Sequence, residues 1–141
     1  MSAIAHSASV SRPASRGLWP FHLGAFADVV VGLDLVLFAD HIARLAMPHQ
    51  ATILGFEPES VMRGLGVFLI LFAIETVVVA RSSGALARFR AWVVAANWAT
   101  VALAAIVIAF WHGAFSAIGI AGIAAIGLAL AVLSTFQQRA L

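Results

Sequence analysis

The sequence has 141 residues, of which 63% are hydrophobic and 10% are charged, whereas a soluble globular chain is about 45–50% apolar and about 25% charged. Its net charge of +2 comes from eight arginines, with no lysine, against six acids; these are too few and too scattered for a basic nucleic-acid-binding face. The absence of cysteine excludes disulfides, thiolate metal sites and cysteine nucleophiles. The composition therefore indicates a membrane protein with one domain.

The first 18 residues are rich in serine and alanine, contain Arg12 and Arg16, and have no acid. This composition is similar to that of transit peptides, but the order of a secretory signal, with basic residues before an apolar core, is missing. We therefore expect a flexible cytoplasmic tail over residues 1–18, followed by a transmembrane domain over residues 19–141.

Four apolar runs follow the tail, and each is long enough to cross a hydrocarbon core of about 30 Å at a rise of about 1.5 Å per residue. They predict an all-α fold, a bundle of four transmembrane helices. A stretch with Pro48 and Pro58 predicts a longer outer loop between the first two helices, whereas residues 111–115 allow only a tight turn between the last two. The expected helices are about 20–46, 61–80, 87–111 and 115–137.

The arginines are distributed unequally between the two ends of these helices. If both termini and the 81–90 loop lie on one side, that side collects all but Arg44 and Arg63. The positive-inside rule then predicts that both termini are cytoplasmic, and we expect the protein in the bacterial inner membrane. The arginines assigned to the cytoplasmic side are Arg12, Arg16, Arg81, Arg88, Arg90 and Arg139.

Each predicted helix carries one polar residue roughly 7–12 Å inside the cytoplasmic edge, counting about 1.5 Å per residue. Intramembrane carboxylates near hydrogen-bonding partners can exchange protons, which favours a proton-linked or ligand-binding site. The same residues are also typical of a hydrogen-bonded clamp that fixes a bundle. The predicted intramembrane polar layer is Asp28, Glu75, Asn97 and Ser134.

The first helix is unusual because it also contains Asp34, which we expect in mid-membrane, and Asp40. An aspartate that faces lipid near the bilayer centre costs roughly 2.5–3.5 kcal/mol on insertion scales, so these acids should face protein, water or a partner. His41 follows Asp34 by seven residues and should share its helix face. Such a face suits a channel or transporter, or an interface with a partner subunit.

A second polar group is expected at the outer side, where Asp40 and Arg44 form a favourable i,i+4 pair. Histidine and carboxylate bind divalent metals, and His41 with His112 could ligate a haem. However, the spacing has no metal signature of the HExxH kind. We therefore expect solvated helix ends, with no metal and no cofactor. This outer cluster is Asp40, His41, Arg44 and His112.

Small residues recur every four positions from the last turn into the fourth helix. Small residues let helices approach closely in lipid, where van der Waals contact drives their association. The stripe predicts packing, either within the bundle or at a homo-oligomer interface. Its members are Gly113, Ala117, Ala121, Ala125 and Ala129.

From about Asp34 onward, the chain resembles a family of small bacterial four-helix integral membrane proteins with no assigned activity. The resemblance implies a four-helix membrane protein and carries over no activity. The three aspartates of the first helix and the long tail do not belong to the family's pattern. The likeness rests on Arg63-Gly64-Leu65-Gly66, the arginine turn 81–90, Ala95-Ala96-Asn97-Trp98, the turn at Trp111 and the end Phe136-Gln137-Gln138-Arg139.

No catalytic template of the GxSxG, CxxC, P-loop or GxGxxG kind occurs, so we do not expect an enzyme. The leading hypothesis is a non-enzymatic membrane protein that acts by helix packing, as a homo-oligomer or as an accessory subunit of a membrane complex. One alternative is a small transporter or a proton or ion pathway that uses Asp28, Asp34, Glu75 and Asn97. Another is a bundle that binds an apolar ligand such as a quinone or pigment.

Overall fold

The computed structural model describes residues 18–50, 52–83 and 88–141, and over these residues the fold is all-α. Four helical segments are long and apolar enough to cross a membrane: α1, α3, α4 with the turn that follows it, and α5. The prediction of an all-α protein with four candidate spans is therefore confirmed. The helices are α1 (Trp19–Leu37), α2 (Ala39–Ala46), α3 (Pro58–Arg81), α4 (Phe89–Trp111), the 3-10 turn η2 (His112–Ala114) and α5 (Ala117–Gln138).

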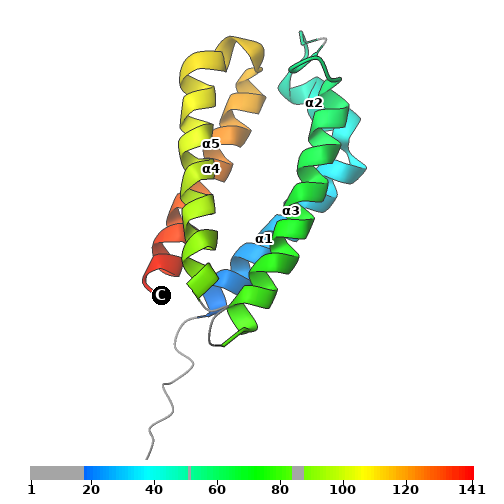
Figure 1. Cartoon of the computed structure of the whole chain (residues 1–141). Helices are drawn as coiled ribbons and strands as arrows, with labels where there is room; N and C mark the ends of the chain where they lie inside the picture. Colours follow the sequence, from blue (N-terminus) through cyan, green and yellow to red (C-terminus); the bar gives the residue numbers. More distant parts are fainter. Residues whose placement is uncertain (1–17, 51, 84–87) are drawn as a thin grey trace, which may run out of the picture.

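The helices form two antiparallel pairs (Figure 1). Helix α1 packs mainly along α3, and α4 packs mainly along α5, with fewer contacts between the two pairs. The pairs converge at the end of the molecule where α1 begins and the chain ends. We call this the inner end, and the opposite one, where α2 lies, the outer end.

The first predicted helix, 20–46, is divided into two helices at Phe38, whose backbone (φ −115°, ψ 23°) is not helical. At about 1.5 Å per residue, the 19 residues of α1 already extend about 28 Å. The residues that follow are amphipathic: Ala39 and Ala43 are buried, while Asp40 and Arg44 are exposed. The chain bends because a straight continuation would not bury the alanine face of α2 against α3 and α5, which it contacts.

Helices α1 and α3 cross at a pair of glycines. A Cβ atom on Gly32 would lie 2.7 Å from the backbone oxygen of Gly66, and one on Gly66 would lie 2.6 Å from the backbone oxygen of Gly32. No side chain fits at either position without moving a backbone. The two glycines therefore allow the close contact on which helix association in lipid depends.

At the inner end, a small apolar core joins α1, α3 and α4. Phe21 and Ala80 are fully buried there, together with Val93 and Val94. The guanidinium of Arg90 donates hydrogen bonds to the carbonyl oxygens of Ala80 (3.0 Å) and Ser82 (2.9 Å). It thereby satisfies carbonyls at the C-terminus of α3 that have no partner within the helix.

At the outer end, Ser116 connects the two pairs. Its backbone N–H donates to the carbonyl of Ala46 (2.7 Å), and its hydroxyl donates to the carbonyl of Leu45 (2.6 Å). The same hydroxyl accepts a hydrogen bond from the N–H of Gly119 (3.0 Å), as a serine N-cap does. The two helix pairs are thus joined at both ends.

Candidate functional site

Two buried amide side chains connect three helices at the inner end. The Asn97 side chain on α4 donates a hydrogen bond of 2.8 Å to Gln137 Oε1 on α5, and Gln137 Nε2 donates one of 3.3 Å to the carbonyl oxygen of Pro20 on α1. Gln137 is fully buried and Asn97 is 6% exposed. Buried polar groups in proteins are nearly always hydrogen-bonded, so this chain of bonds holds the two helix pairs in one arrangement.

Two hydroxyl groups are also buried near the inner ends of their helices. Thr76 of α3 and Ser134 of α5 are 1% and 0% exposed, and neither hydroxyl has a hydrogen-bond partner among the described residues. Ser134 precedes Gln137 by three residues and so shares its helix face. Gly24 of α1 leaves room here, since a Cβ atom on it would lie 3.0 Å from Gln137 Nε2.

The four residues of the predicted polar layer have different environments. Asn97 and Ser134 are buried, Asp28 is half-buried, and Glu75 is exposed on α3. The hydrogen-bond partner of Asn97 is Gln137, which the sequence interpretation had assigned to the end of the last helix. Gln137 follows Ser134 by three residues and therefore shares its helix face. This spacing is the sequence signal by which Gln137 could have been found.

The side chain of Asp34 is exposed, and the residue lies three positions before the end of α1. It is located just beyond the Gly32–Gly66 crossing, toward the outer end. His41 belongs to α2 and is also exposed. The expectation that Asp34 and His41 share one face of a continuous helix is wrong, because the chain leaves the helical conformation at Phe38 between them.

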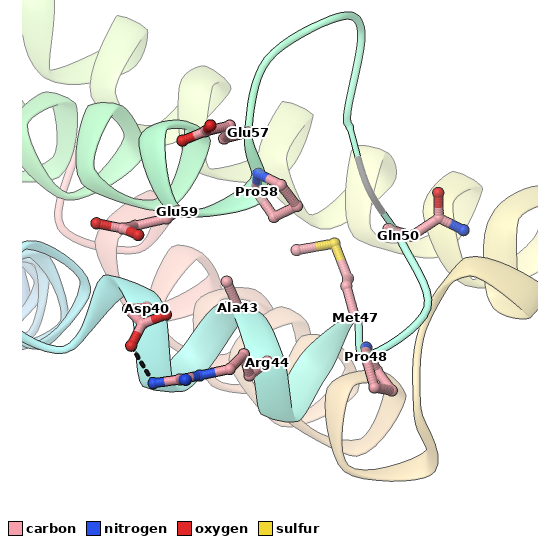
Figure 2. A pocket seen from close by; sticks show the side chains of 9 residues that line it. All are labelled: Asp40, Ala43, Arg44, Met47, Pro48, Gln50, Glu57, Pro58 and Glu59. Carbon is pink, nitrogen blue, oxygen red and sulfur yellow. Dashed lines mark hydrogen bonds and ion pairs between the residues drawn. The ribbon is translucent and has the colours of Figure 1, made fainter.

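Two members of the predicted outer cluster, Asp40 and Arg44, line a shallow, open pocket of about 320 Å³ between α2 and the start of α3 (Figure 2). The buried side chains of Ala43 and Met47 lie on its apolar side. Ion pairs join Asp40 to Arg44 and Glu59 to Arg63, each one helical turn apart. Asp40 and Glu59 are thus each neutralised by an arginine of the same helix. This arrangement is typical of helix ends that are exposed to solvent.

His112, the remaining member of the predicted outer cluster, is exposed in the turn η2 between α4 and α5. Over the described residues, there is no group of three or more histidine, aspartate or glutamate side chains that could hold a metal ion.

The predicted packing stripe lies on the outer surface of the single chain. Its five members, Gly113, Ala117, Ala121, Ala125 and Ala129, are all exposed, as is Gly122. The glycines and alanines of α5 that are buried within the chain are Gly119, which lies against Ala46, and Gly127, which lies against Ala104. This chain therefore does not use the stripe for its own packing.

Helix α4 has a second exposed face of small residues, which the sequence interpretation missed. This face is directed away from Ala104, the residue that contacts α5, because its members are about half a helical turn from Ala104 around the helix axis. In contrast, the exposed residues of α1 and α3 are mostly bulky, and only Ala27 and Gly64 are small and apolar. The members of the α4 face are Ala91, Ala95, Ala99, Ala102 and Ala109.

These observations define an all-α, multi-pass membrane protein made of two packed helix pairs. A comparison with models of known protein families finds no match, and searches of curated proteins and of solved structures find none either.

Proposed function

We propose that this chain is a non-enzymatic integral protein of the bacterial inner membrane that acts by helix packing, as an accessory subunit of a membrane complex or as a homo-oligomer. The observation that supports this most directly is the contrast between the two helix pairs. Both pairs expose large apolar side chains, such as Phe68 on α3 and Leu128 on α5. Pair α4–α5 also exposes faces of alanine and glycine, whereas the exposed apolar residues of α1 and α3 are bulky except for Ala27 and Gly64. In lipid, small-residue faces permit close approach of another helix, and bulky faces do not.

The proposed orientation has both termini in the cytoplasm. Arg81, Arg88, Arg90 and Arg139 belong to the inner end of the molecule, and Arg44 and Arg63 to the outer end. The positive-inside rule assigns the richer end to the cytoplasm. Because the natural chain has no cysteine, a single cysteine at Ser83 should be protected from a membrane-impermeant thiol reagent in intact spheroplasts, and one at Thr52 should be labelled.

The proposal is tested by adding bulk to the small-residue face. In the double variant Ala121→Leu/Ala125→Leu, self-association measured by energy transfer in vesicles, or co-purification with a partner from native membranes, should fall at least tenfold. Gly64→Leu is the matched control, because it adds similar bulk at an exposed position of the other helix pair. Purification of the natural chain only as a monomer with no stable partner would contradict the proposal.

A further inference from the structure

The carboxyl group of Glu75 is exposed on an apolar surface of α3. The exposed side chains nearest to it along the helix are Leu71, Ile74 and Val78, each more than half exposed. Glu75 lies six residues before Arg81, the last residue of α3, which places it about 9 Å from the helix end at about 1.5 Å per residue. The acid thus lies more than one helical turn inside a candidate membrane span.

Glu75 has no ion pair or hydrogen bond with any described residue, whereas Asp40 and Glu59 at the outer end are each paired with an arginine. Ionisable side chains within membrane spans are rare and nearly always pair with another group or line a water-filled cavity. Among the described residues, Glu75 has no such partner. Its neighbour Thr76 is the residue that is turned inward and buried.

A second copy of the chain does not offer a suitable cation. The arginines of the described residues all lie near helix ends, and long basic side chains at such positions extend toward the interface rather than into the hydrocarbon. Arg90 of α4, which contacts the C-terminal end of α3, already donates to two carbonyl oxygens there. Over the described residues, a second copy therefore offers no arginine at the depth of Glu75.

We propose that the Glu75 face of α3 is the docking site for a transmembrane helix of a different protein, which carries an arginine or lysine at the same membrane depth. This inference rests on the proposed function in its accessory-subunit form. An arginine is the best complement, because its guanidinium forms two parallel hydrogen bonds to a carboxylate. The small-residue faces of α4 and α5 stay available for other contacts.

The test uses the full chain in phosphatidylcholine vesicles, labelled with a donor fluorophore at a single cysteine replacing Thr52. The probes are two acceptor-labelled leucine–alanine transmembrane peptides with identical flanks. One has an arginine six residues from one end of its apolar segment, and the other has leucine there. The arginine peptide should bind at least tenfold more tightly than the leucine peptide.

Variants of the chain test whether the preference for the arginine peptide depends on Glu75. Glu75→Gln should abolish it and Glu75→Asp should keep it. Asp34→Asn, which neutralises the other exposed acid within α1 and α3, should leave it unchanged. Circular dichroism checks that each variant keeps its helices. Equal binding of the two peptides, or a preference that persists in Glu75→Gln, would overturn the inference.

Energy transfer between copies of the chain distinguishes failure of this inference from failure of the proposed function on which it rests. If copies associate through the α5 face while the peptides bind equally, the docking site is refuted and the helix-packing proposal stands. If association between copies itself requires Glu75, the partner is a second copy and the inference is wrong. If neither copies nor peptides associate, and no partner co-purifies from native membranes, both proposals fail.

Discussion

The side chains of Asn97 and Gln137 are hydrogen-bonded at 2.8 Å although they are 40 residues apart in the chain. Among the described residues, this is the side-chain to side-chain hydrogen bond that joins two different helices. Since Gln137 also reaches the backbone of Pro20, a single side chain links α5 to both α4 and α1. The two helix pairs are thus aligned at the inner end by hydrogen bonds as well as by apolar contact.

Replacing Gln137 by leucine should destabilise the bundle, because the buried amide of Asn97 then loses its acceptor. An unsatisfied buried donor costs about 1–3 kcal/mol, and side-chain hydrogen bonds between membrane helices contribute about 0.6 kcal/mol on average. We expect a loss of about 1–2 kcal/mol in SDS-driven unfolding from mixed micelles. Gln138→Leu is the control, since Gln138 is exposed on the same turn; equal effects of the two variants would argue against the Asn97–Gln137 contact.

The sequence was sufficient to predict the number of candidate membrane spans and that they are helical, because each apolar run is long enough to cross a membrane as a helix. It was also sufficient to single out Asn97 and Ser134 as intramembrane polar residues. It could not show which way each polar side chain turns. Glu75 and Thr76 are adjacent, and only the packing of α3 against its neighbours leaves the carboxyl group exposed and the hydroxyl group buried.

Gly66→Ala should separate α1 from α3, because the new methyl group would lie 2.6 Å from the backbone oxygen of Gly32. Overpacking of this kind typically costs about 1–3 kcal/mol. The expected result is a lower unfolding midpoint and weaker disulfide cross-linking between cysteines introduced at Val36 and Met62. Gly64→Ala on the same helix is the control, since a Cβ atom there meets nothing within 4 Å. If both variants behave alike, the close crossing does not exist in the membrane.

The glycine crossing shows why packing partners were harder to predict than spans. The four-residue repeat predicted that Ala117, Ala121 and Ala125 pack against another helix, but they are exposed in the single chain. The close crossing of α1 and α3 depends instead on Gly32 and Gly66, which belong to no repeat. In water, the apolar face of a helix identifies its buried side. In lipid, both faces are apolar, and only residue size distinguishes them.

Arg90→Gln should loosen the last turn of α3. The guanidinium that donates to Ala80 and Ser82 is replaced by a shorter side chain that cannot span both carbonyls. Amide hydrogen exchange of Ala80 and Ser82 should accelerate about tenfold, which corresponds to about 1.4 kcal/mol of local stability. Arg81→Gln removes a neighbouring exposed arginine and should change these rates much less.

Ser116→Ala should release the outer end of the α4–α5 pair. The substitution removes the N-cap acceptor of the Gly119 N–H and the donor to Leu45, and loss of a serine N-cap costs about 1 kcal/mol. Hydrogen exchange should therefore increase at Gly119, and at Ser116 itself, whose N–H bonds to Ala46. Ser82→Ala is the matched control, because the Ser82 hydroxyl donates within α3, to Val78. An increase confined to Gly119 would mean that the hydroxyl only caps α5, whereas an increase at both amides would show that it also holds the two helix pairs together.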